Sequence, residues 1–427
     1  MTRTTHAGCE EFERASRTSR RGFLRGVAGT TGAMVTTRLF GETLLEASHG
    51  ASTTGNVLVV VSFRGGIDGL GVVVPHADPG YYAARRSIAV SRSSVIAADA
   101  SFGLHPQMAP LLPMWNSGRL AAVQAVGLPV PNRSHFKAIE EVEDADPGSS
   151  VRRGWVNRMI GLGGIVGPAE AVHLSTPLSP TMFAGPAPTM ATDGFKALTL
   201  PGLGSTRTAK RYAGQRAVWS GTSSPLTQAA ADALSISSGL ASRMSAAYTP
   251  ANGARYPTAW PSTELAEALR DAANLIKRNV GTTVISIDYG SWDMHADYGN
   301  QTGGQMQAMV GGFAAAVAAF FTDLGTLGER VTLATISEFG RRVAENGNRG
   351  LDHGWGNMML VAGGGVRGGQ YYGRWPGLSS GNLVAGDLQV TTDYRNVLGE
   401  IVARRFPDRS LGEVFPGLSY RPLGLMA

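Results

Sequence analysis

The stretch VLVVVSFRGGIDG, residues 57–69, joins a continuous apolar run to a turn rich in glycine. Residues 57–63 are apolar at nearly every position rather than at alternate positions, which is typical of a strand buried on both faces of a sheet. The glycines that follow permit a sharp turn, and they bracket a single carboxylate, Asp68. A buried strand that ends in this way predicts a helix-covered sheet with a site at the end of the strand.

Four further apolar runs resemble the first, and helical patterns lie between them. We expect strands at residues 57–63, 120–126, 283–287, 331–336 and 357–362, and helices at residues 107–116, 134–144, 264–280, 305–327 and 393–405. Alternation of strands and helices is typical of an α/β fold, here a three-layer fold with a mostly parallel sheet flanked by helices. Residues 161–262 are rich in Gly, Pro, Ser, Thr and Ala, and we interpret them as a cap-like insertion with some helix at 228–247.

The composition is typical of a large globular chain. Its 427 residues are 43% hydrophobic and only 16% charged, which argues against global disorder. No window of about 18 residues is uninterrupted apolar sequence, so no internal membrane span is expected. The net charge of +6 comes without a dense Lys/Arg block interleaved with aromatics. Nucleic acid is therefore not an expected partner, whereas a modest positive charge suits an anionic substrate.

The first 51 residues have the character of an export signal. Arg20 and Arg21 are followed by Gly-Phe-Leu-Arg and by a mild apolar stretch that ends at Arg38. This order is typical of a twin-arginine signal peptide, although an ordinary basic amphipathic N-terminus is the alternative. We expect cleavage near residues 47–51, a mature domain at 52–427, and the twin-arginine export machinery as a partner. The location would be extracellular, cell-wall or periplasmic, and Cys9 would leave with the leader.

Side chains suited to metal binding and to anion binding collect around the ends of the predicted strands. They are Arg64, Asp68, Arg133, Ser134, His135, Asp293, His295, Glu338 and His353. Carboxylates and imidazoles that converge from several loops predict a site for one or two divalent ions, of which we consider Zn, Mn, Mg and Ca. Ser134, at the start of a predicted helix, could be a metal-activated nucleophile, and the two arginines could bind a phosphate or sulfate group.

Each of these residues also has a structural interpretation. Asp68 could be a turn residue, and Ser134 could only cap its helix. His295 beside Asp293 could be a surface hydrogen-bonded pair, and Glu338 could simply lie at a helix N-terminus. His353 could support a ligand instead of being one. The remaining histidines of the predicted mature domain are interpreted as structural: His76, His105 and His173.

Beyond the leader, short motifs run in a fixed order from residue 57 to about 406. They include SFRGGIDGLGVVVPHADPGYYAARRSIAV, FGLHPQMAPLLPMWNSGRLAAVQAVG, RSHF, GWVNRMI, GSWDMHAD, SEFGRR, DHGWGNMMLVAGGGVRGGQYYGRWPGL and TTDYRNVLGEI. With the leader, they resemble the bacterial family called domain of unknown function 1501. That resemblance implies an alkaline-phosphatase-like fold, shared by phosphatases, arylsulfatases and phosphopentomutases.

The same resemblance implies residue roles. Asp68 matches a first-strand metal aspartate, Ser134 the nucleophile position, Asp293 and His295 the middle metal ligands, and His353 a late histidine ligand. Glu338 stands where an Asp-His pair is usual, so one histidine ligand is missing. Either His135 replaces it, or the second ion binds weakly or is absent. Ser134 is followed by His-Phe-Lys-Ala, which lacks the pattern of formylglycine sulfatases, so that chemistry is disfavoured.

Two functional hypotheses follow. The first is an exported metal-dependent hydrolase of anionic esters, most readily small or polymeric phosphoesters, that uses a metal-activated Ser134 or water. In it, Asp293, His295 and His353 hold one ion, while Asp68, Glu338 and His135 hold the other. The second is a non-catalytic secreted binding or assembly protein that keeps the fold and one structural ion. A redox enzyme is a third reading, but the sequence has no cofactor motif.

Overall fold

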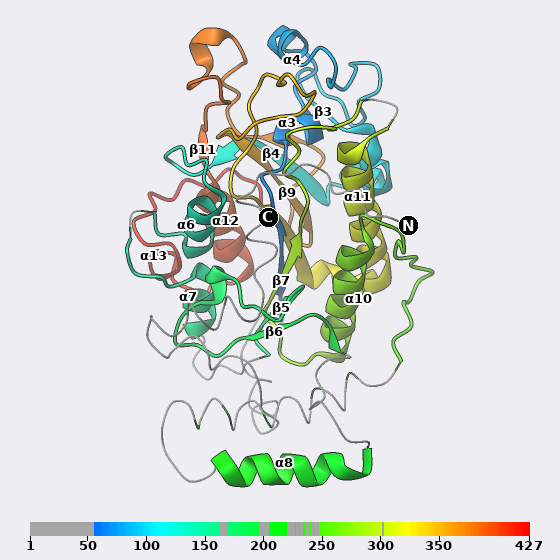
Figure 1. Ribbon diagram of the computed structural model, residues 1–427, viewed down its shortest axis with the longest axis vertical. Helices are drawn as coiled ribbons and strands as arrows, with labels where there is room; N and C mark the ends of the chain where they lie inside the picture. The colour runs from blue at the N-terminus through cyan, green and yellow to red at the C-terminus, as the bar shows by residue number, and fades with distance from the viewer. Residues whose placement is uncertain are drawn as a thin grey trace.

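The first apolar run is β1 (Val57–Phe63), and it lies inside the sheet with β7 on one side and β8 on the other (Figure 1). The chain is described by a computed structural model over residues 55–147, 149–162, 169–195, 205–219, 247–300 and 303–427, with single positions between 227 and 244. The nine-stranded sheet has the order β10-β4-β9-β8-β1-β7-β5-β6, and β11 pairs with β4. The predicted class, an α/β fold with a mostly parallel sheet flanked by helices, is confirmed.

The strand bounds agree closely with the apolar runs. The other strands of the sheet are β4 (Leu120–Gly127), β5 (Ala171–Leu174), β6 (Met190–Thr192), β7 (Val284–Tyr289), β8 (Val331–Ile336), β9 (Asn357–Gly363), β10 (Tyr371–Tyr372) and β11 (Thr392–Asp393). A separate two-stranded sheet pairs β2 (Val73–Val74) with β3 (Gly103–Leu104). The five expected strands are therefore all present, because nearly continuous apolar sequence is a strong signal for a doubly covered strand.

The direction of β9 differs from that of its neighbours. It pairs antiparallel with both β8 and β4, whereas β1 is parallel to β7 and to β8. An antiparallel strand begins at the edge of the sheet where the parallel strands end. The residues just before β9 therefore lie at the same edge as the residues just after β1, β7 and β8, and His353 reaches that edge in this way.

Helices cover both faces of the sheet, which gives three layers. Alternate residues of β1 point to opposite faces: Val59 belongs to one buried cluster and Leu58 to the other. The first cluster contains side chains of α5 (Leu112–Asn116), α10 (Thr263–Arg278), α11 (Gln305–Leu324) and the 3-10 helix η3 (Pro106–Leu111). The second contains side chains of α6 (His135–Asp144), α7 (Trp155–Gly161), α12 (Tyr394–Arg405) and α13 (Leu411–Val414). Figure 1 shows these two groups on opposite sides of the strands.

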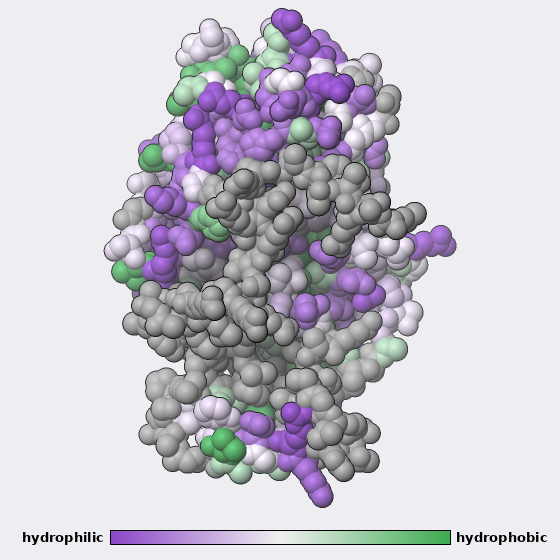
Figure 2. All heavy atoms as spheres, in the orientation of Figure 1, coloured by the Kyte–Doolittle hydropathy of each residue, from purple (hydrophilic) through white to green (hydrophobic). Residues whose placement is uncertain are grey.

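Shorter elements complete the end of the molecule where β1 terminates. They are α3 (Gly69–Val72) and α4 (Pro79–Ala84), with 3-10 turns elsewhere at η4 (Thr181–Phe183), η6 (Gly325–Arg330) and η7 (Ser380–Asn382). Hydrophilic side chains dominate the upper part of the face in Figure 2, around α4. That end carries the loops that follow the parallel strands.

One helical stretch, Gln305–Arg330, is long and apolar enough to cross a membrane by length and composition. Within the structure, its side chains Met309, Val310 and Phe313 are buried in the core of the first cluster. The core helix of a globular protein has the same length and composition. The stretch is therefore part of the helical layer that covers the first face of the sheet.

The segment at residues 161–262 contributes to the sheet itself. β5 and β6 extend the sheet beyond β7. They are only four and three residues long, so they give no recognisable strand pattern in the sequence. The helix α8 (Ser205–Trp219) lies at the bottom of Figure 1, at the opposite end from α3 and α4. The described helix of this segment is therefore no lid over the edge where the parallel strands end. The helix expected at 228–247 lies largely outside the described residues, as does the predicted leader.

Candidate metal centre

Three histidines converge on one carboxylate oxygen at the carboxyl edge of the sheet. The Nε2 atoms of His295, His353 and His135 lie 3.0, 3.3 and 3.6 Å from Oδ1 of Asp293. The Nε2 atom of His353 lies 3.1 Å from that of His135 and 3.1 Å from that of His295. The ligand atoms of His135, Asp293 and His353 all lie within 4.8 Å of one another.

These separations fit a common ion. Ligands that bind one ion at about 2.0–2.2 Å lie roughly 3–3.5 Å from each other, as the nitrogen and oxygen atoms do here. Two imidazole nitrogens 3.1 Å apart either share a proton in an N–H···N hydrogen bond or hold a cation between their lone pairs. Imidazole nitrogen with one carboxylate suits borderline transition metals such as Zn, and it is a poor set for Mg or Ca, which prefer oxygen.

The outer ring nitrogen of each histidine has its own acceptor. Nδ1 of His135 lies 2.9 Å from Glu338 Oε1, Nδ1 of His295 lies 2.9 Å from Asp352 Oδ1, and Nδ1 of His353 lies 2.9 Å from the carbonyl oxygen of Arg133. Histidines that bind metals nearly always donate Nδ1–H in this manner, which fixes the tautomer with the Nε2 lone pair toward the ion. His135 and His353, together with Asp293, could therefore hold a metal ion, and the ring of His295 has the same kind of outer contact.

The charges around the centre favour a cation. Burial alone would raise the pKa of Asp293, but its contacts with the three histidines and with Arg341 hold that pKa far below its ordinary value. Burial alone would lower the pKa of His135, but Asp293 and Glu338 raise it to about 9. A metal ion and a proton compete for the same electron pairs in such a site.

Exposure differs across the centre. The side chains of His135 and Asp293 are 4% and 1% exposed, whereas those of His353 and His295 are 16% and 26% exposed. An ion here would thus be enclosed on one side and reachable from solvent on the other. Catalytic metal sites keep an open coordination position, while structural sites are closed.

Arg341 ties three loops to the centre. Its Nη2 donates to Asp293 Oδ1 at 2.7 Å, its Nε donates to the carbonyl of Gly66 at 2.6 Å, and its Nη1 donates to the carbonyl of Leu351 at 2.9 Å. The side chain is 1% exposed. The guanidinium therefore aligns the loops after β1 and β7 with the loop that precedes His353.

The glycine turn after β1 packs directly against this arrangement. Gly65 donates its backbone N–H to Glu338 Oε1 at 2.7 Å. Gly66 has φ +68°, and a Cβ atom there would lie 2.5 Å from Phe339 Cε2. The Phe339 ring in turn lies 4.8 Å from the His135 ring and 4.7 Å from the His353 ring, centroid to centroid. Gly66 is thus required by a neighbour of the histidines.

Asp68 is not brought to the centre, contrary to the expectation. Arg85 donates to both of its oxygens, at 2.6 and 2.8 Å, and Tyr298 donates its hydroxyl at 2.6 Å. Arg85 and Asp68 are 0% and 3% exposed. Their pairing fixes the segment after the glycine turn. Of the expected second ligand set, Glu338 and His135 lie together, with Glu338 Oε1 2.9 Å from the outer nitrogen of His135, whereas Asp68 pairs with Arg85.

The two expected anion-binding arginines both contact carboxylates. Arg64 donates to Glu143 at 2.6 Å and to Asp288 at 2.9 Å, and Arg133 donates through Nε to Asp387 at 3.0 Å. Their side chains are 20% and 37% exposed.

Ser134 lies between Arg133 and His135, at the position before α6, and its side chain makes no capping hydrogen bond. Ser134 thus occupies the N-cap position with an extended backbone, and its hydroxyl does not supply the capping hydrogen bond.

Sequence reasoning does not assign roles to Phe339, Arg341 and Asp352. Arg341 and Asp352 stand next to predicted site residues in the motifs SEFGRR and DHGWGN, and this proximity is the available signal. Phe339 stands out in the sequence only as the residue in place of a histidine. Its packing against two imidazole rings becomes visible only in three dimensions.

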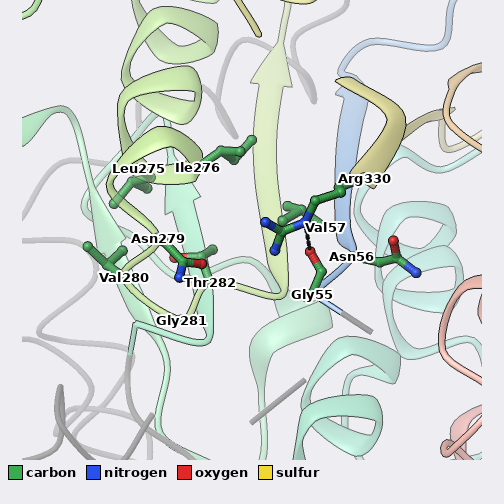
Figure 3. A pocket seen from close by; sticks show the side chains of 10 residues that line it. All are labelled: Gly55, Asn56, Val57, Leu275, Ile276, Asn279, Val280, Gly281, Thr282 and Arg330. Carbon is green, nitrogen blue, oxygen red and sulfur yellow. Dashed lines mark hydrogen bonds between the residues drawn. The ribbon is translucent and has the colours of Figure 1, made fainter. Parts of the chain in front are cut away.

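A separate pocket of about 230 Å³ lies at the opposite end of the sheet, where β1 begins (Figure 3). It is formed by the start of β1 and the end of α10, and Arg330 donates from Nε to the carbonyl of Gly55 at 2.7 Å. No histidine, aspartate or glutamate lines it among the described residues. The pocket is unrelated to the metal centre.

The fold and the centre define an α/β protein with a histidine-rich site at the carboxyl edge of its sheet. The chain belongs to the family described as "Protein of unknown function (DUF1501)", which it matches over residues 100–406. No curated protein matches the chain. Family membership, expected from the motifs, is thus confirmed, and the family itself carries no established activity.

Proposed function

We propose that this protein is a metal-dependent hydrolase of anionic esters, most readily phosphoesters, with one ion held by Asp293, His135, His353 and His295. The observation that carries the proposal is the convergence of three oriented imidazoles on Asp293 Oδ1 at 3.0–3.6 Å. A borderline divalent ion there would polarise an ester oxygen and lower the pKa of a water molecule. This ligand set supports Zn over Mn, Mg or Ca.

The residues of the chain would orient the reaction. His295 and His353, on the more exposed side of the centre, mark the direction from which an ester can approach. Ser134 immediately precedes the ligand His135 and begins a helix, where backbone N–H groups favour an anion. Its hydroxyl is one candidate nucleophile, and a water oriented by the same loop is the other. Arg133 and Arg64 have further N–H donors for negative charge on the transferred group.

Metal content and hydrolysis test this proposal together. The purified protein should contain one equivalent of ion per chain, and it should hydrolyse aryl phosphates or phosphodiesters with a rate that chelation abolishes and metal restores. His353→Ala should lose both the ion and the activity. Ser134→Ala distinguishes the two candidate nucleophiles. The variant should lose all turnover if the Ser134 hydroxyl attacks the ester, and it should keep most of its turnover if a water molecule attacks. Full metal occupancy without turnover on phosphate or sulfate esters contradicts the hydrolase.

A non-catalytic secreted binding or assembly protein with a structural ion is the second candidate. It is favoured by the engagement of Arg64 and Arg133 with carboxylates and by the lack of a second ligand set around Asp68. It predicts that Ser134→Ala keeps every biological effect of the wild-type protein while the ion remains bound.

The proposal includes export by the twin-arginine route. Its support is the sequence of residues 20–38, which lie outside the described residues. A chain in which Arg20 and Arg21 are both replaced by Lys should remain in the cytoplasm. Normal export of that variant contradicts the assignment.

A further inference from the structure

We infer that Glu338 is a positioning residue that fixes His135 as a metal ligand, and that it does not bind the ion itself. The inference rests on the metal centre of the proposed function, but it does not depend on ester hydrolysis. It concerns the tightness with which the ion is held, and it gives the buried carboxylate after β8 a defined role.

Both carboxylate oxygens of Glu338 make hydrogen bonds, and Oε1 lies on the Nδ1 side of the His135 ring. Oε1 accepts from the backbone N–H of Gly65 at 2.7 Å and lies 2.9 Å from His135 Nδ1, and Oε2 accepts from the hydroxyl of Ser337 at 3.1 Å. The residue is 3% exposed. A carboxylate that accepts Nδ1–H leaves Nε2 as the only ring nitrogen with a lone pair, and that atom faces Asp293.

The geometry around Glu338 suits an acceptor. Its Oε1 faces two N–H groups, the backbone N–H of Gly65 and Nδ1 of His135. An ionised carboxylate in such a site pulls on the Nδ1–H bond and raises the basicity of Nε2. The effect is strong because the surroundings are nearly dry.

The three histidines differ in the groups that support them. His135 has a buried carboxylate, while the carboxylate on His295, that of Asp352, is 56% exposed and also accepts from Asn346 at 3.0 Å. His353 has only the neutral carbonyl of Arg133. Water screens an exposed charge far more than a buried one. Glu338 should therefore contribute more to metal affinity than Asp352 does.

The experiment compares Glu338→Gln with Asp352→Asn in the full chain. Each protein is titrated with Zn²⁺ against a chromophoric chelator, and with Co²⁺ to follow the visible spectrum. Glutamine keeps an oxygen for Gly65 N–H but removes the charge. We expect Glu338→Gln to lower the affinity for the ion by about 10–100-fold and Asp352→Asn to lower it clearly less. Wild-type affinity of Glu338→Gln, or equal losses in the two variants, overturns the inference.

Two further measurements separate positioning from folding. Nitrogen-15 NMR of the metal-free chain, recorded at a pH high enough to keep the His135 ring neutral, should show the Nδ1–H tautomer in the wild type and a tautomer mixture in Glu338→Gln, and an unchanged tautomer contradicts the inference. If Glu338→Gln does not fold, Glu338→Asp keeps the charge on a shorter side chain and should still lose affinity. Wild-type affinity of that variant overturns the inference. If the variants show the expected difference in affinity but the wild type hydrolyses no ester, the inference on Glu338 stands and the hydrolase proposal is refuted.

Discussion

The ring of Phe339 fills the space that a side chain on Gly66 would need, since a Cβ atom at Gly66 would lie 2.5 Å from Phe339 Cε2. Displacement of Phe339 would disturb the rings of His135 and His353, because Phe339 packs against both of them. The φ of +68° at Gly66 adds a backbone preference for glycine. The turn after β1 and the rings of His135 and His353 therefore belong to one packing unit.

Gly66→Ala should consequently weaken both stability and metal binding. Adoption of a left-handed backbone by alanine costs roughly 1–2 kcal/mol, and displacement of Phe339 adds to that cost. Gly417→Ala is a matched control, because Gly417 has the same φ of +68° and a Cβ atom there would have nothing within 4 Å. Urea unfolding and Zn²⁺ titration should show that both variants lose stability but that only Gly66→Ala loses affinity. Unchanged affinity of Gly66→Ala would mean that Phe339 does not set the positions of the histidines.

Removal of the ion should lower the thermal stability of the wild-type chain. An ion at 100 times its Kd stabilises the folded state by about 2.7 kcal/mol. His353→Ala should abolish the difference in Tm between chelated and Zn²⁺-saturated protein. His76→Gln is the control, because His76 is a buried histidine that contacts the carbonyl of Asp99 instead. A full metal-dependent shift in His353→Ala would remove His353 from the ligand set.

Asp68→Asn distinguishes an ion pair from a metal ligand. The substitution leaves Arg85 fully buried without its charge partner, which should cost about 3–5 kcal/mol in the free energy of unfolding. The double variant Asp68→Asn with Arg85→Met should regain part of that loss, because no unpaired charge remains. Both variants should bind Zn²⁺ with wild-type affinity while folded. Loss of the ion at wild-type stability would instead make Asp68 a ligand.

His105 should make the protein sensitive to acid. Burial lowers its pKa to about 4, a shift that the charge of Asp68 only partly opposes. The folded state thus favours the neutral ring, whose Nδ1 accepts from the N–H of Gln107 at 3.1 Å. Stability from this group is fully present above the unfolded pKa of about 6.5, and it is lost as the pH falls through about 4. The shift corresponds to about 3 kcal/mol.

His105→Asn keeps a capping side chain but removes the titration. Its free energy of unfolding, measured by urea at several pH values, should fall less steeply between about pH 6.5 and 4 than that of the wild type. The metal-site histidines titrate in both proteins, so their contribution cancels in the difference. Parallel curves for the two proteins would show that His105 does not carry the acid sensitivity.

The sequence predicts the core of this fold well and its edges poorly. β1 and β8 have the expected bounds, because continuous apolar residues between turns leave little freedom. β5 has four residues, one of them the polar His173, and so gives no local signal. The antiparallel direction of β9 also has no local signal, since it depends on the path of the chain between residues 337 and 356.

The candidate site shows the same division. Grouping residues by strand ends brings Asp293, His295, His135 and His353 together, because parallel strands present their carboxyl ends at one edge. The same grouping assigns Asp68 to the site, but its position depends on a buried Arg85 that lies 17 residues further along the chain. Partner choice between two charged groups is decided by three-dimensional packing and desolvation, which spacing in the sequence does not encode.

The antiparallel course of β9 has a consequence for the order of assembly. His135 and His353 are 218 residues apart, and only the Asp293–His295 pair is local in sequence. Contacts this distant in the chain form late in folding, because long loops must close first. A chain still emerging or half folded offers no complete chelating group. If the proposed ion binds, it can be held only after β4, β7, β8 and β9 have paired, so that loading would follow folding.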